Sequence, residues 1–336
     1  MSYITLNKKA FFNNADYYNN LLGGKDKLCI ALKDNAYGHG LSQIGQLCLE
    51  YGIKHCMVRD IEEANIASQY SFETILILYD RPTKAYPSNY IFTINSLDDI
   101  SSYSPNTKVE LKIDTGMSRN GIYHSQIDEA LKLISKNNLI LNGVFTHFCC
   151  ADVDTQDDIT KKQEENFLNS IKYIKTKVDK PFKIHCSNTA GVHKANNSLY
   201  DMARIGIGLY GYSQPVQKYL KPILSLWANK ISTRTLQKGD GIGYGSSYKI
   251  EENNTIVSNY DIGYGDGFFR IDENQKVFVK NSEQILGRIS MDSFSIKGDV
   301  SEICIFDNVI NLIKIHNTIE YEIFTHLMPR IKRHII

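Results

Sequence analysis

Residues 28–40 read LCIALKDNAYGHG, an apolar run that ends at a lysine and continues as a polar segment containing glycine. A short continuous apolar run of this kind is typical of a strand buried on both faces, as in a parallel sheet. Lys33 is the first polar residue beyond the run, so we expect it at the carboxyl end of that strand. In folds with parallel sheets this end carries the chemistry.

Seven more apolar runs follow in the first two-thirds of the chain. Stretches with helical spacing lie between many of them, for example Ile127, Ala130 and Ile134. Eight strands alternating with helices predict an α/β fold, a TIM-like (β/α)8 barrel. A doubly wound sheet is the alternative that the pattern alone leaves open. The eight runs are residues 28–32, 56–58, 74–78, 91–94, 109–113, 141–148, 183–188 and 202–207.

The pattern changes after about Pro222, where short apolar runs are separated by Gly, Asn and Asp turns. Such spacing predicts a second domain that is predominantly β. We therefore expect a barrel over residues 1–222 and a β domain over residues 223–336, with the first few residues packing with the β domain. Residues 318–335 are expected to form a helix that stops near Pro329. The predicted strands are residues 223–236, 256–262, 277–279, 285–291, 294–296, 303–306 and 310–313.

The composition limits the kinds of partner. Lys and Arg number 38 against 37 Asp and Glu, so no general field attracts nucleic acid or an anionic membrane. No apolar run is long enough to cross a bilayer, and the first residues lack a signal-peptide pattern, which predicts a soluble, cytoplasmic protein. The seven cysteines contain no C-x-x-C pair; reduced thiols are expected, and no metal site is predicted.

The segment that begins at Lys33 is the first that indicates a catalytic site. A lysine at the end of a barrel strand has a rigid base, and partial burial favours the neutral amine that Schiff-base chemistry needs. A lone lysine in this place is more often a surface residue. Residues 33–40, KDNAYGHG, resemble the cofactor-lysine motif of alanine racemases nearly residue for residue. The resemblance implies a fold type III enzyme in which Lys33 binds pyridoxal 5'-phosphate as a Schiff base.

The resemblance extends along most of the chain at matching intervals. Residues 111–121, LKIDTGMSRNG, are similar to the family segment whose arginine, here Arg119, reaches the cofactor's phenolic oxygen and the substrate. The triplet DTG also occurs in aspartic proteases, but their dyad needs two copies and the chain has one. Residues 146–148 resemble the segment that places a histidine, here His147, beside the pyridine ring. A lone histidine at a strand end would more often be structural.

Two segments after the seventh and eighth strands indicate the phosphate site. Residues 185–190, HCSNTA, and 204–208, RIGIG, lie where barrel enzymes commonly bind phosphate. We predict that the N–H groups of Gly206 and Ile207 bind the cofactor phosphate together with the hydroxyls of Thr189 and Tyr37. Asn188 is assigned to the same cofactor site.

Residues 206–211, GIGLYG, also satisfy the dinucleotide fingerprint G-x-G-x-x-G. No helical pattern begins there and no acidic residue follows at the required distance, so we reject that reading. By resemblance, Arg204 faces the pyridine nitrogen. A guanidinium cannot donate its proton there, which makes the ring a weaker electron sink and restrains transamination and decarboxylation.

Three segments of the predicted β domain resemble parts of the family that approach the active site of the other subunit. Residues 243–248, GYGSSY, carry the second acid-base residue, Tyr244. Within residues 262–267, IGYGDG, Tyr264 would control access, and within residues 287–292, GRISMD, Met291 and Asp292 would bind the substrate carboxylate. The resemblance therefore implies a homodimer with composite active sites.

Lys112, Ser118 and His326 are three further positions at which the family pattern bears on the site. Lys112 lies in a predicted strand, where an ordinary ammonium is costly to bury; in some family members this lysine is carbamylated, and the same is predicted here. Ser118 stands where glycine is usual before the arginine. His326 stands where many members have a tyrosine that reaches the cofactor phosphate.

Together these residues predict an isomerase that interconverts L-alanine and D-alanine and supplies D-alanine for peptidoglycan. Lys33 would act on one face of the substrate and Tyr244 of the partner subunit on the other. A barrel-type decarboxylase and a racemase of broader specificity are the alternatives within enzymes. A cofactor-binding homeostasis protein without turnover is the third reading, against which the second domain with Tyr244 argues.

Overall fold

The computed structural model describes residues 1–98, 100–271 and 275–336. These residues form two compact units, which we describe separately. The first, the barrel unit, comprises Phe12–Ala36 and Ile44–Lys221. The second, the β unit, comprises Met1–Phe11, Tyr37–Gln43 and Pro222–Ile336.

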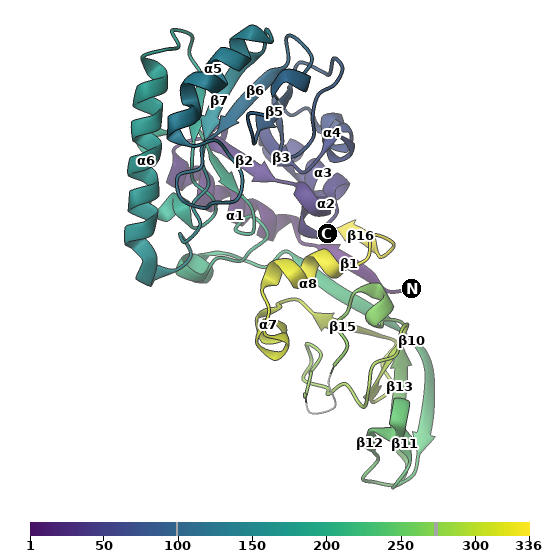
Figure 1. The fold of residues 1–336 in the computed structure, drawn as a ribbon. Helices are drawn as coiled ribbons and strands as arrows, with labels where there is room; N and C mark the ends of the chain where they lie inside the picture. Colours follow the sequence, from purple (N-terminus) through teal and green to yellow (C-terminus); the bar gives the residue numbers. More distant parts are fainter. Residues whose placement is uncertain (99, 272–274) are drawn as a thin grey trace. The chain divides into compact units, whose positions relative to one another are not determined.

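The barrel unit is built on eight parallel strands in the order β8-β7-β6-β5-β4-β3-β2-β9. Figure 1 labels β2, β3, β5, β6 and β7 of this sheet. The two end strands are joined through backbone hydrogen bonds from Asp201 N–H to Ile184 O and from Arg204 N–H to Ser187 O, both 2.9 Å. The sheet is therefore a nearly closed barrel, which confirms the predicted fold over the doubly wound alternative. Its strands are β2 (Leu28–Ala31), β3 (His55–Val58), β4 (Thr74–Ile77), β5 (Tyr90–Ile94), β6 (Lys108–Lys112), β7 (Ile140–Phe145), β8 (Lys183–His185) and β9 (Ala203–Ile205).

The helices that alternate with these strands bury one apolar face. Helix α5 (Ile127–Lys136) buries Ile127, Ala130 and Ile134, the positions that the helical spacing indicated. Further helices are α1 (Lys8–Leu22), α3 (Leu41–Tyr51), α4 (Ile61–Ala67) and α6 (Asp157–Lys175). None of the helices in the described ranges has the length and apolar character that a membrane span requires.

The β unit contains a six-stranded sheet in the order β14-β13-β10-β1-β16, with β15 also paired to β10. Strand β1 runs antiparallel to β10 and parallel to β16, so an early and a late segment of the chain are neighbours. A separate two-stranded sheet joins β11 and β12. The strands are β1 (Tyr3–Leu6), β10 (Leu224–Leu236), β11 (Gly241–Ile242), β12 (Tyr248–Lys249), β13 (Thr255–Tyr260), β14 (Phe294–Lys297), β15 (Glu302–Phe306) and β16 (Lys332–Ile335).

Four local predictions for the β unit were wrong. Residues 310–313 belong to helix α7 (Ile310–His316), because a short apolar run cannot by itself distinguish a strand from a helix. The predicted helix at 318–335 is only α8 (Glu320–His326), and the chain then forms β16 because β1 offers it a pairing edge. The runs at 277–279 and 285–291 make only isolated bridges.

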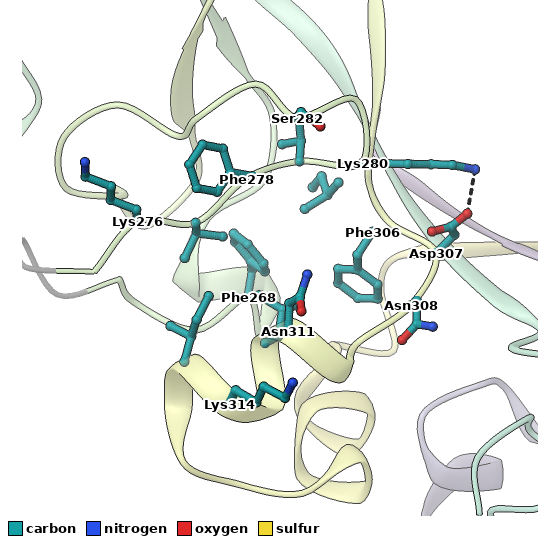
Figure 2. A pocket seen from close by; sticks show the side chains of 15 residues that line it. Phe268, Lys276, Phe278, Lys280, Ser282, Phe306, Asp307, Asn308, Asn311 and Lys314 are labelled. Carbon is teal, nitrogen blue, oxygen red and sulfur yellow. Dashed lines mark ion pairs between the residues drawn. The ribbon is translucent and has the colours of Figure 1, made fainter. Parts of the chain in front are cut away.

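A cavity of about 510 Å³ lies in the β unit beside α7 (Figure 2). Its inner wall includes Phe268, Phe306 and Leu312, and lysines line it as well. One of them, Lys280, forms an ion pair with Asp307, as the dashed line in Figure 2 shows. No residue predicted for the active site lines this cavity, so it is not the candidate site.

Candidate active site

Lys33 follows β2 directly and begins a left-handed turn. Asp34, Asn35, Ala36 and Tyr37 have φ angles of 55, 53, 53 and 50°. Consecutive L-residues in this region cost roughly 1–2 kcal/mol each. Hydrogen bonds help to hold the turn: Asn35 N–H donates to Glu63 Oε1 at 2.8 Å, and Ala36 N–H donates to the Leu32 carbonyl at 2.7 Å. Backbone strain maintained in this way is typical of a functional site.

The Lys33 amine contacts the residue that follows it in the chain. Its Nζ forms an ion pair with Asp34 Oδ2 at 2.8 Å, and Arg59 Nη1 lies 3.6 Å from the other Asp34 oxygen. Both side chains of the Lys33–Asp34 pair are partly exposed, so the amine is accessible rather than enclosed in the core.

Arg204 on β9 is a buried cation whose two terminal nitrogens both have acceptors. Its Nη2 donates to the carbonyls of Thr146, at 2.7 Å, and Cys186, at 3.0 Å. Its Nη1 lies 2.5 Å from His185 Nδ1, and its guanidinium carbon lies 5.0 Å from the centre of the Phe145 ring. The side chain is therefore fixed by groups from the ends of β7 and β8.

Arg204 changes the titration of its neighbours. Loss of solvation, together with the charge of Arg204, lowers the pKa of His147 to about 3, so His147 is neutral at physiological pH. Burial and the charges of Arg119 and Arg204 lower the pKa of Lys112 to about 8.

The loops after β8 and β9 are joined by Thr189. Its Oγ1 accepts hydrogen bonds from Gly206 N–H at 3.0 Å and Gly208 N–H at 3.3 Å. A Cβ at position 208 would lie 2.2 Å from the Tyr18 hydroxyl oxygen, so only glycine fits there without rearrangement. Asn188 accepts from Gly191 N–H at 2.8 Å and thus shapes the first of these loops.

Arg119 is exposed and lies on the loop after β6. Asp114 Oδ1 accepts hydrogen bonds from three successive N–H groups, those of Gly116, Met117 and Ser118, at 2.9 to 3.1 Å. Ser118 has a φ of 55°, a conformation that glycine adopts at lower cost. The backbone thus explains why a serine is unusual before Arg119.

Tyr37 lies in the β unit, where its ring makes an edge contact with Tyr321 of α8, with centroids 5.2 Å apart. Gly38 follows, and a Cβ there would lie 1.9 Å from the Phe324 carbonyl oxygen. His326, at the end of α8, is exposed, and its Nδ1 donates to the Glu322 carbonyl at 2.7 Å.

The three segments predicted to serve the other subunit meet within the β unit. Tyr264 N–H donates to Ser290 O at 3.2 Å, and Gly265 N–H donates to Met291 O at 2.8 Å. A Cβ at Gly243 would lie 3.0 Å from the Arg288 carbonyl oxygen, so the segment of Tyr244 packs against the same loop.

The large side chains of these segments are exposed in the single chain. The exposed fractions are 69% for Tyr244, 41% for Tyr264 and 54% for Met291, and Asp292 is exposed as well. Exposed aromatic and apolar side chains gathered in one place mark a surface that binds another molecule.

Sequence reasoning missed three residues that support the site. Gln163 of α6 is buried; its Oε1 accepts from Cys149 N–H at 3.0 Å and its Nε2 donates to the His147 carbonyl at 3.3 Å. Its spacing of four from buried Phe167 was a signal that could have identified it. Glu110 is a charged residue between two apolar residues of a predicted strand, and this signal could also have identified it. Tyr321 had no signal, because its contact with Tyr37 is long-range.

Comparison with known proteins decides the family. A family model described as the alanine racemase N-terminal domain matches residues 6–214, and one for the alanine racemase C-terminal domain matches residues 223–335. The chain belongs to the alanine racemase family. The alanine racemase of Campylobacter concisus is 39% identical over 342 residues and covers all of both chains. That of Nitratiruptor sp. is 39% identical and covers 99% of each.

Solved structures of alanine racemases agree with this assignment. The enzyme from Clostridium difficile 630 has a TM-score of 0.87 and 25% identity, covering all of this chain and 95% of that one. The Bacillus anthracis alanine racemase with bound L-Ala-P gives the same score, identity and coverage. The predicted family, fold and racemase activity are thereby confirmed, ahead of the decarboxylase and the non-catalytic reading. Members of this family depend on pyridoxal 5'-phosphate and act on an amino acid.

Proposed function

We propose that this alanine racemase binds pyridoxal 5'-phosphate at the carboxyl ends of the barrel strands and inverts alanine between Lys33 and Tyr244 of the partner subunit. The observation that carries the proposal is the pairing of β2 with β9, in which Cys29 lies opposite Arg204. Because these strands are parallel neighbours, the segment that follows each one, with Lys33 on one side and Gly206 and Ile207 on the other, lies at the same end of the barrel.

The chemistry of the donor set fits this cofactor. Lys33 supplies a primary amine for its aldehyde carbon, and Arg204 supplies a buried guanidinium for the ring nitrogen. The hydroxyl of Thr189 and the N–H groups of Gly206 and Ile207 are the kinds of donor that bind phosphate. In the single chain the Gly206 N–H donates to Thr189 Oγ1, so it would have to share its hydrogen bond between this oxygen and the phosphate. Arg119, His147, Asn188 and Tyr37 complete the proposed set. When bound, the cofactor acidifies the substrate Cα–H by withdrawing electrons.

The residues of the chain then have distinct tasks. Lys33 removes or returns the Cα proton on one face, and the Tyr244 phenol of the partner subunit does so on the other. Arg204 has no proton to give at physiological pH, so it keeps the ring nitrogen unprotonated and limits side reactions. Met291 and Asp292 of the partner subunit border the substrate, with Arg119, and Tyr264 of the partner subunit narrows the entrance.

The exposure of Tyr244, Tyr264 and Met291 supports a homodimer with composite sites, since these side chains lack a cover in the single chain. Carbamylation of Lys112 also belongs to this proposal: its lowered pKa provides the neutral amine that reacts with CO₂, and the resulting anion could hold Arg119. A cytoplasmic location and a role in supplying D-alanine for peptidoglycan follow from the family rather than from the fold.

A chiral assay tests the proposal directly. The purified holoenzyme is expected to convert L-alanine and D-alanine to the same racemic mixture, with no alkylamine formed. Broader specificity would appear as comparable kcat/KM values for serine or larger amino acids. Release of CO₂, or binding of the cofactor without turnover of any amino acid, would refute it.

A further inference from the structure

A chain of buried polar groups leads away from Arg204 into the barrel wall. His185 on β8 accepts from Arg204 Nη1 through Nδ1, and its Nε2 donates to Glu110 Oε2 on β6 at 2.7 Å. The other oxygen of Glu110 accepts from Asn142 Nδ2 at 3.1 Å. Glu110, His185 and Arg204 are each at most 2% exposed. A buried carboxylate of this kind is costly unless it is paired and hydrogen-bonded.

The hydrogen bonds fix the proton on His185. A guanidinium can only donate and a carboxylate can only accept, so Nδ1 must be the bare nitrogen and Nε2 the protonated one. The imidazole is then neutral, and burial lowers its pKa, which keeps it so. It also stacks on Phe145, with ring centres 5.0 Å apart and planes 5° from parallel.

The fold makes room for the carboxylate. Gly143 on β7 faces Glu110, and a Cβ there would lie 2.9 Å from Oε1 and 3.0 Å from Cδ. The β6 and β7 register shifts beside Glu110, between Val109 and Glu110. The glycine and the register shift therefore make space for the Glu110 side chain. A carboxylate without a function would not need such an adjustment of the strand.

We propose that Glu110 is a positioning residue for the racemase reaction: through His185 it orients the Arg204 guanidinium and balances its charge. The proposal rests on the proposed function, in which Arg204 faces the cofactor ring nitrogen. Glu110 itself touches neither substrate nor cofactor. Its carboxylate holds the imidazole edge-on to Arg204, so that Nη1 stays bound to His185 while Nη2 stays bound to the Thr146 and Cys186 carbonyls.

The first test uses the protein without cofactor. In protein with ¹⁵N-labelled histidine, His185 is expected to show an Nε2–H signal shifted far downfield by the carboxylate. H185N assigns that signal by removing it. E110Q keeps the shape and removes the charge, so the signal should move upfield, and G143A should move it by pushing the carboxylate aside. H55Q, which changes a buried histidine of β3, is the control and should leave the signal unchanged. An Nε2–H signal unaffected by E110Q would overturn the proposal.

The second test is a double-mutant cycle on the loaded enzyme. E110Q is expected to lower kcat by about tenfold, with KM changed much less, by analogy with the residues that orient metal-binding histidines. Because Glu110 acts through His185, E110Q should have almost no further effect on kcat in an H185N background. Equal losses in both backgrounds, or a kcat for E110Q like that of the wild type, would contradict the proposal.

The two tests separate this proposal from the proposed function. If the wild type neither binds the cofactor at Lys33 nor racemises alanine, the proposed function fails, while the signals of the cofactor-free protein still decide whether Glu110 controls His185. If E110Q moves the His185 signal, and if it lowers kcat in the wild-type background but not in the H185N background, both the proposed function and the positioning role of Glu110 are supported.

Discussion

The Thr189 hydroxyl oxygen lies 3.0 Å from the Gly206 nitrogen and accepts its hydrogen bond, which joins the loops after β8 and β9. Thr189→Val has nearly the same shape but leaves the N–H groups of Gly206 and Gly208 without this acceptor. We expect it to lower the free energy of unfolding by about 1–3 kcal/mol and to weaken cofactor binding. Urea unfolding and titration with pyridoxal 5'-phosphate measure both effects. Thr189→Ser, which keeps the oxygen, should stay near the wild type, and equal losses in the two variants would exclude the hydroxyl as the cause.

Lys33 is expected to be the covalent site of the cofactor. Borohydride reduction of the holoenzyme followed by peptide mapping should place the pyridoxyl group in the peptide that contains Lys33. Lys33→Ala should give no labelled peptide. A label on another lysine of the wild type would sink the assignment.

The composite site predicts complementation between inactive variants. Tyr244→Phe should retain the cofactor but lose most racemisation, and Lys33→Ala should lose both. If equal amounts of the two exchange subunits freely, half of the dimers contain one intact site, so about a quarter of the wild-type activity should return. Each variant incubated alone is the control. Subunit exchange verified by mass, without recovered activity, would refute the composite site.

Lys112 gives a pH-dependent prediction with a definite sign. Its pKa is 10.5 as a free side chain and about 8 in the folded chain, so the unfolded state binds more protons between these values. An unmodified Lys112 therefore makes the free energy of unfolding rise with pH from about 8 toward 10.5, by on the order of 3 kcal/mol in total. Below pH 8 the folded protein bears the full cost of burying the charged ammonium.

Carbamylation should abolish this rise. Unfolding measured between pH 8 and 9.5 should depend less on pH in bicarbonate than in CO₂-free buffer, and Lys112→Met should be insensitive to bicarbonate. Native mass spectrometry in bicarbonate reports the modification itself. Identical pH profiles with and without bicarbonate, and no added mass, would count against it.

Ser118→Gly should stabilise the protein. The left-handed conformation at position 118 strains serine but not glycine, and part of this gain is offset because glycine is more flexible in the unfolded chain. We expect a net increase of about 0.5–1 kcal/mol in the free energy of unfolding. Ser118→Ala, which keeps the strain, is the matched comparison and should show no increase.

The sequence predicts those features that depend on local pattern. The apolar run before Lys33 identifies β2 and its carboxyl end, and the same reasoning locates the other barrel strands. Residues 310–313 show the limit of this reasoning, because an apolar run that was predicted to be a strand forms part of helix α7. The link between Glu110 and His185, 75 residues apart, depends on the barrel bringing β6 near β8. The lowered pKa of His147 likewise depends on its burial and on the charge of Arg204, and neither can be seen in the local sequence.

The pairing of β1 with β16 also sets an order of events during translation. The ribosome makes Tyr3–Leu6 first, yet its two sheet neighbours, β10 and β16, are more than 200 residues downstream. All the strands of the barrel are complete before β10 is made, so that unit can fold while synthesis continues. The β unit must wait for later segments: β1 has no sheet partner until β10 is made, and its other edge stays unpaired until β16 follows. Nascent chains stalled before residue 224 should therefore resist proteases in the barrel while Tyr3–Leu6 stays open to cleavage or to chaperones.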